Sequence, residues 1–100
     1  MLRFLLLGLL AIATGVQAAY PLGTMTCDDI ANFASEAMSW RNEAQTREQA
    51  LATLDMRTYN DPVEKKNLAA IVDVVFGPYG RNWTVESAGN VMRTYCMAGR

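Results

Sequence analysis

Two cysteines, Cys27 and Cys96, are the residues of this chain whose chemistry is the easiest to predict. They are its only thiols, and they lie too far apart for the Cys-x-x-Cys spacing of a redox-active pair. In an oxidising compartment two such thiols form a structural disulfide. The alternative, two free buried thiols, would suit a cytosolic protein. Because an export signal precedes both cysteines, the sequence predicts the disulfide.

Side chains that commonly carry catalysis or bind metals are scarce. The chain has no histidine, which excludes Ser–His–Asp and Cys–His catalysis and every histidine-dependent metal site. No glycine-rich phosphate loop is present. Asp28 and Asp29 are adjacent, so on a helix their carboxylates point about 100° apart and do not converge on one ligand. We therefore expect no catalytic residue, no metal and no cofactor, and a protein that is not an enzyme.

Residues 1–18 have the three parts of a secretory signal peptide. These parts are the basic residue Arg3, the continuous apolar stretch 4–13, and the small residues Val16 and Ala18 at the −3 and −1 positions of a cleavage site. We expect cleavage before Ala19. The alternative is an uncleaved membrane anchor, but the apolar stretch is about half of the roughly 20 residues that a spanning helix needs. The sequence thus predicts a periplasmic or secreted protein with no stable membrane anchor after cleavage.

After cleavage, residues 19–100 are expected to form one small domain. Loss of Arg3 leaves eight basic and ten acidic residues, so the formal net charge is about −2. Without a basic tract, the domain is not expected to bind nucleic acid or anionic lipid. A chain this short buries little more than about 60% of its unfolded surface. A disulfide that closes so long a loop adds roughly 4 kcal/mol of stability, and we expect the fold to need it.

Four segments carry apolar residues at the spacing of a helix, which predicts an all-α fold. The expected helices span residues 28–43, 47–56 and 61–76, and a fourth follows residue 84. Their predicted caps are Thr26 or Cys27, Thr46 with Gln49, Asp61 followed by Pro62 and Glu64, and Thr84. Residues 71–76 are rich in β-branched side chains, which is also typical of a strand, but the preceding cap and the length of the segment favour a helix.

An even number of alternating helices brings Cys27 and Cys96 to the same end of the fold. An odd number would separate them by a helix length, beyond the roughly 7 Å between Cα atoms that a disulfide allows. The sequence therefore predicts a small four-helix bundle, three helices long and one short, closed by one disulfide. In the last helix, the expected inner face consists of Val85, Ala88, Val91, Met92, Tyr95 and Cys96.

The candidates for partner binding are Trp40, Arg41, Tyr79, Arg81 and Trp83. Arg41 lies in line with the apolar stripe of the first helix. It either binds a partner beside Trp40, or caps the end of its own helix and extends into solvent. The segment 79–83 combines Tyr, Arg and Trp, the composition of a binding hot spot. The alternative for Trp83 is a hydrophobic staple against the fourth helix, and residues 82–84 also match a glycosylation sequon.

Part of this pattern resembles a group of known proteins. Cys27, Ile30, Ala34, Ala37, Met38 and Arg41, followed by Ile71, Val72, Tyr95 and Cys96, resemble small uncharacterised bacterial and phage-associated exported proteins with two cysteines. That resemblance implies a helical periplasmic protein without an established activity. More weakly, residues 26–30 are similar to the first cysteine region of periplasmic acid-stress chaperones, which are also small helical proteins held by one disulfide.

Two functions follow as expectations. The first is an exported protein–protein interaction module, such as an inhibitor or an immunity factor, whose partner is another protein. The alternative is an acid-stress chaperone, in which protonation of carboxylates below about pH 4 loosens the fold into a client-binding state.

Overall fold

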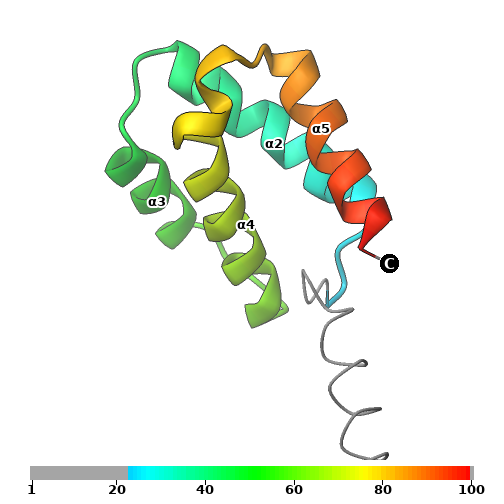
Figure 1. The fold of residues 1–100 in the computed structure, drawn as a ribbon. Coiled ribbons are helices and arrows are strands. Elements are labelled where there is room, and N and C mark those ends of the chain that lie inside the picture. The colour runs from blue at the N-terminus through cyan, green and yellow to red at the C-terminus, as the bar shows by residue number, and fades with distance from the viewer. Residues whose placement is uncertain (1–22, 100) are drawn as a thin grey trace, which may run out of the picture.

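The computed structural model describes residues 23–99, which form four α-helices and one 3₁₀ helix (Figure 1). The α-helices are α2 (Cys27–Asn42), α3 (Arg47–Asp55), α4 (Pro62–Val75) and α5 (Val85–Ala98), and the 3₁₀ helix η1 (Pro78–Asn82) joins α4 to α5. Residues 23–99 contain no strand, so the predicted all-α, four-helix fold with a short second helix is confirmed. The signal peptide at residues 1–18 and its cleavage before Ala19 lie outside the described residues.

Reciprocal capping boxes start three of the helices. The pairs are Thr26 with Asp29 for α2, Thr46 with Gln49 for α3, and Thr84 with Ser87 for α5. In each pair, the threonine hydroxyl accepts a hydrogen bond from the third helical N–H, and the partner side chain accepts one from the threonine N–H. The box of α3 is the one that the sequence predicts in full. The other two use Asp29 and Ser87 in place of the usual Glu or Gln. The sequence therefore did not predict the hydrogen bonds that these two side chains accept from the threonine N–H groups.

Asp61 caps α4 and also holds the segment that leads into α2. Its Oδ1 accepts a hydrogen bond from the Val63 N–H at 3.0 Å, and its Oδ2 accepts from the Thr24 N–H at 3.1 Å. Gly23 has a positive φ of 57°, and a side chain at this position would collide with the Asp61 carboxylate. The hydrogen bonds from Val63 and then from Thr24 lower the pKa of Asp61 below its ordinary value.

This lowered pKa makes the stability of the domain depend on pH. A carboxyl group whose pKa is depressed by folding stabilises the fold above its ordinary pKa of 3.8, and the contribution is lost as the pH falls through the lower folded value. We expect Asp61→Asn to flatten the fall in unfolding free energy below about pH 4. Denaturant titrations from pH 7 to pH 2 measure this fall. The control is Glu48→Gln in the first turn of α3, and an equal flattening there would contradict the prediction.

Helix α2 is the centre of the packing. Helix α5 lies antiparallel along one side of α2, α4 packs on another side, and α3 packs mainly on α4 (Figure 1). Close approach of α2 and α5 depends on Gly89, because a Cβ atom there would lie 2.5 Å from the Ser35 Oγ. That hydroxyl donates a hydrogen bond to the Val85 carbonyl at 2.7 Å. Helices α4 and α5 thus flank α2 without packing extensively on each other.

The core is built from apolar side chains that α2, α3, α4 and α5 turn toward one another. The largest fully buried side chains are Ile30, Leu54, Ile71, Val72 and Val75. Three of them come from the segment 71–76 that was also compatible with a strand. Residues 71–75 form the end of α4, and Phe76 is its C-cap. The helical interpretation is therefore confirmed.

The inner face predicted for α5 is only half right. Ala88, Met92 and Cys96 are buried, but Val85, Val91 and Tyr95 are 38%, 41% and 59% exposed. A helix that packs on a single neighbour buries a narrow stripe, and α5 packs chiefly on α2. Its apolar stripe is wider than that contact, so an apolar flank of α5 remains open.

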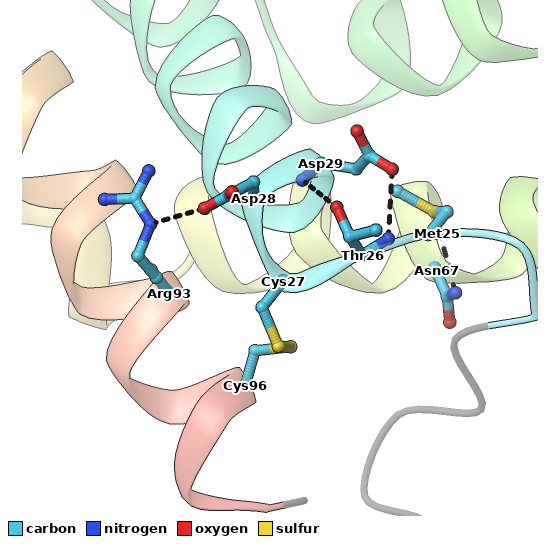
Figure 2. Close-up of a disulfide and its surroundings, with 8 residues drawn as sticks. All are labelled: Met25, Thr26, Cys27, Asp28, Asp29, Asn67, Arg93 and Cys96. Carbon is cyan, nitrogen blue, oxygen red and sulfur yellow. Dashed lines mark hydrogen bonds and ion pairs between the residues drawn. A yellow bond between two sulfur atoms is a disulfide. The ribbon is translucent and has the colours of Figure 1, made fainter.

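The disulfide joins the beginning of α2 to the last turn of α5 (Figure 2). The Cys27–Cys96 bond has an S–S distance of 2.08 Å and a Cα–Cα distance of 5.6 Å, which confirms the prediction. Beside it, the Arg93 Nε donates to the Asp28 carboxylate at 3.0 Å and ties the same two helices together (Figure 2). Such a bond indicates an oxidising environment outside the cytoplasm. None of the helices between residues 23 and 99 has the length and hydropathy of a membrane span.

Candidate partner-binding groove

An apolar groove lies between α4 and α5, and η1 forms part of its wall. Its volume is about 370 Å³, within the roughly 300–1,000 Å³ typical of binding clefts. The lining residues are Val74, Tyr79, Trp83, Val91, Met92 and Tyr95. Three of these side chains are aromatic, and none of them carries a formal charge. The groove therefore offers dispersion and hydrophobic contacts, with the phenol and indole groups as polar handles.

Two charged side chains on the helices beside the groove, Asp73 and Arg93, are bonded to other helices. The charged residues of α5 are Glu86 and Arg93, which lie on the opposite flank of the helix from Val91. Arg93 is bonded to Asp28 of α2. On α4, Asp73 accepts a hydrogen bond at 2.7 Å from Arg47 of α3, on the far side of the helix from α5. Both helical walls of the groove are consequently uncharged.

Arg41 fixes the wall of the groove from behind. Its Nη1 donates to the Val75 carbonyl at 2.6 Å and to the Gly77 carbonyl at 2.9 Å. These carbonyls belong to the end of α4 and the link to η1, where carbonyl groups have no hydrogen-bond donor within the helix. Arg41 therefore caps a neighbouring helix, and the expectation that it caps its own helix was wrong. Its position on the stripe facing α4 explains the difference.

Gly80 completes this support. A Cβ atom at Gly80 would collide with the Val75 carbonyl oxygen and would lie 3.1 Å from the Arg41 Nη1. The Gly80 carbonyl in turn accepts a hydrogen bond from the Trp83 N–H at 3.1 Å. Backbone contacts thus link the end of α4, which Arg41 holds, to η1 and to the backbone of Trp83, whose side chain lines the groove.

The other candidate residues are divided between the groove and its surroundings. Tyr79 is 77% exposed and Trp83 is half-buried against the core, and both line the groove. Arg81 is exposed on η1 and is not a lining residue. The structure thus brings Tyr79 and Trp83 together at the groove and places Arg41 behind them.

Trp40 belongs to a different cluster. Its ring meets Phe33 edge-on, with centroids 5.7 Å apart, and the Arg57 guanidinium lies 5.7 Å from the Trp40 ring and 5.6 Å from the Phe33 ring. Arg57 also donates to the Glu36 carboxylate at 2.7 Å. These contacts hold the connector after α3 against α2. The placement of Trp40 is therefore explained by packing and by a cation–π contact.

A second depression, of about 340 Å³, lies near the start of α2, and several of its polar groups already have partners. Two of its three carboxylates are engaged: Asp29 belongs to the capping box of α2 and Glu36 is bonded to Arg57. Among residues 23–99, no group of three or more His, Cys, Asp or Glu side chains is arranged to hold a metal ion. The apolar groove is the stronger candidate site.

Sequence reasoning missed the α4 and α5 walls of the groove. Val91, Met92 and Tyr95 were assigned to the buried face of the last helix, and Val74 was not singled out. The available signal was the width of the apolar stripe in α5, which exceeds what contact with one helix covers.

The fold and the groove define a disulfide-closed, all-α domain with an uncharged aromatic cleft. Comparison with protein-family models, with curated proteins and with solved structures finds no match to this chain. The resemblances to exported two-cysteine proteins and to acid-stress chaperones stay predictions.

Proposed function

We propose that this domain is an exported, periplasmic or secreted, protein–protein interaction module of the inhibitor or immunity type, and that it is not an enzyme. The observation that carries the proposal is the uncharged groove with Tyr79 and Trp83 on its wall. Tyrosine and tryptophan dominate binding hot spots because they bury much surface at a low cost in conformational entropy. Exposed apolar side chains gathered around a cleft are typical of an interaction site.

A rigid groove favours tight binding, because little ordering entropy remains to be lost on association. Here the η1 wall is held by Arg41, and the α5 wall is held by the disulfide and by the Arg93–Asp28 ion pair. Every one of these supports lies outside the lining of the groove. The supports therefore stabilise the binding surface without occupying it.

Affinity capture with matched variants tests the proposal. The wild-type domain is immobilised and exposed to a periplasmic or culture-fluid extract of its host, alongside Tyr79→Ser and a control, Met56→Ser, whose side chain is 87% exposed outside the groove. We expect a specific protein to be retained by the wild type and the control, and its affinity for Tyr79→Ser to fall by tenfold or more, the loss typical of a hot-spot truncation. Absence of any specific partner, or equal retention by Tyr79→Ser, would count against the proposal.

A second candidate function, an acid-stress chaperone, is favoured by one observation. The four ion pairs of the described residues are exposed, and each depends on a carboxylate: Arg47–Asp73, Arg57–Glu36, Lys65–Asp55 and Arg93–Asp28. These pairs tie neighbouring segments of the fold to one another, so a medium acidic enough to break them would loosen the contacts between the helices. The test is binding of a hydrophobic dye and suppression of client aggregation at about pH 2 to 3. A compact protein that binds no dye under these conditions removes this candidate.

A further inference from the structure

We propose that residues 23–26 form a lid segment that closes one side of the second depression, at the start of α2, and opens in acid, with the carboxylate of Asp61 as its latch. The lid segment leads into α2, and two of its residues, Thr24 and Met25, line the depression. The inference goes beyond the proposed function, because this depression shares no lining residue with the apolar groove.

One carboxylate holds both the lid segment and the start of α4. The Asp61 Oδ1 accepts from the Val63 N–H at 3.0 Å, and Oδ2 accepts from the Thr24 N–H at 3.1 Å and from the Thr24 hydroxyl at 3.4 Å. Both oxygens are full acceptors only in the ionised group, because protonation turns one of them into an O–H donor. The Val63 N–H belongs to the helix that Asp61 caps, so it keeps the remaining acceptor. Protonation therefore releases Thr24.

The pKa of Asp61 gives the direction of the switch. Hydrogen bonds from Val63 and Thr24 lower this pKa below its ordinary value of 3.8. The latch is therefore closed above pH 3.8 and opens as the pH falls through the lower folded value. The side chain is half-buried, so solvent reaches the carboxyl group.

No base nearby is available to keep Asp61 ionised in acid. The charged or titratable side chains on the segments around it are Asp29 of α2, Arg57 and Tyr59 of the connector after α3, and Glu64 and Lys65 of α4. The two bases of this set have other partners, since Arg57 pairs with Glu36 and Lys65 pairs with Asp55. The state of the latch thus follows the pH of the medium.

Met25 is the second attachment of the lid segment. Its side chain is 8% exposed, and its Sδ accepts a hydrogen bond from the Asn67 amide at 3.7 Å (Figure 2). A thioether is a weak acceptor. Gly23, at the outer end, has a positive φ of 57° and gains much conformational freedom on release. At the inner end, Thr26 stays in the capping box of α2, so loss of the latch favours a swing about Thr26 that withdraws Met25.

Opening uncovers apolar surface. Met25 belongs to the same buried cluster as Phe33 of α2 and Leu68 of α4, and all three line the depression. Phe33 and Leu68 are only 6% and 3% exposed while the lid segment is in place. Withdrawal of Met25 opens a path to both side chains. The acid form of the domain thus presents an apolar surface that the neutral form keeps covered.

Oxidation by hydrogen peroxide tests the inference, because the chain contains its own reference methionines. Peroxide converts a thioether to a sulfoxide where it reaches the sulfur. Met56 is 87% exposed and reports free access, whereas Met38 and Met92 are 2% exposed and report an intact core. Mass spectrometry of proteolytic fragments measures each rate relative to that of Met56. From pH 7 to about pH 2, we expect the relative rate of Met25 to rise by roughly tenfold or more and those of Met38 and Met92 to stay low.

Matched variants separate the latch from general acid effects. In Asp61→Asn, the amide oxygen still caps α4, because Asn and Asp are equally good N-caps, but the NH₂ group replaces the oxygen that Thr24 needs. We expect Met25 of this variant to react roughly tenfold faster than in the wild type already at pH 7. The control, Glu64→Gln, neutralises another carboxylate of the same depression and should leave Met25 protected at pH 7.

Four outcomes overturn the inference. Met25 stays unreactive in acid, or it stays unreactive in Asp61→Asn at pH 7. Glu64→Gln accelerates the oxidation of Met25 as much as Asp61→Asn does. Met25, Met38 and Met92 become reactive together in acid, which would show that the whole core loosens and that no separate lid exists. None of these results bears on partner capture by the apolar groove, so the proposed function is tested independently.

Discussion

Replacement of both cysteines, Cys27→Ala with Cys96→Ala, is expected to leave the domain largely unfolded near physiological temperature. The bond closes a loop with a sequence separation of 69 residues, for which chain entropy predicts a loss of about 4 kcal/mol. That is comparable with the whole stability of a small domain, about 5 kcal/mol at the lower end of the usual range. Alanine is chosen because both sites are buried, at 6% and 4% exposure, and a serine hydroxyl there would add a desolvation cost.

Circular dichroism melts measure the effect, and the midpoint should fall by roughly 15–30 °C, given the usual 4–8 °C per kcal/mol for domains of this size. Wild-type protein in a strong reductant should melt like the double variant, and the double variant should not respond to the reductant. A loss of less than about 1 kcal/mol in the free energy of unfolding would show that helix packing alone holds α5 on α2. That result would contradict the role given to the disulfide.

The second large effect is expected at the junction of α4 and η1. In Gly80→Ala, the added methyl group collides with the Val75 carbonyl oxygen, and because this oxygen belongs to backbone, the junction must shift. We expect a loss of about 2 kcal/mol or more, within the range for overpacking. Arg41→Met removes the charged donor to the same carbonyl and to that of Gly77, at a cost of about 2 kcal/mol. Denaturant unfolding of each variant measures these losses.

A double-mutant cycle decides whether the two effects share one cause. If Gly80→Ala already displaces the carbonyl that Arg41 holds, the combined loss must be clearly smaller than the sum of the single losses. The matched control is Arg81→Met, which removes an exposed arginine from the same 3₁₀ helix and should have little effect. Additive losses at residues 41 and 80 would contradict the coupling of Arg41 to the wall of the groove.

The helices were predictable because their signals are local. Thr46 with Gln49, Asp61 with Pro62, and Thr84 fix the beginnings of three helices through contacts within one turn, so neighbours in sequence suffice to find them. The cysteine pairing was equally predictable, since two thiols in a chain expected to be exported allow one intramolecular bond.

The groove was harder to predict from the sequence, because it is formed by apolar side chains that remain outside the core. Val91 and Tyr95 have the apolar character of core residues, and their exposure follows from the placement of α4 and α5 on different sides of α2. The acceptors of Arg41 lie 34 and 36 residues away in sequence, and no periodicity in the chain points to a pairing at that distance. Tyr79 and Trp83 were found by composition alone.

The span of the disulfide also sets the order of maturation. Cys27 precedes Cys96 by 69 residues, so the thiol on α2 has no intramolecular mate until the ribosome has released α3, α4 and most of α5. The most extensive interhelical contact, between α2 and α5, likewise joins segments that are distant in the chain, which raises the contact order for a helical protein and slows folding. The bond that fixes α5 on α2 can therefore form only after nearly the whole domain has been synthesised.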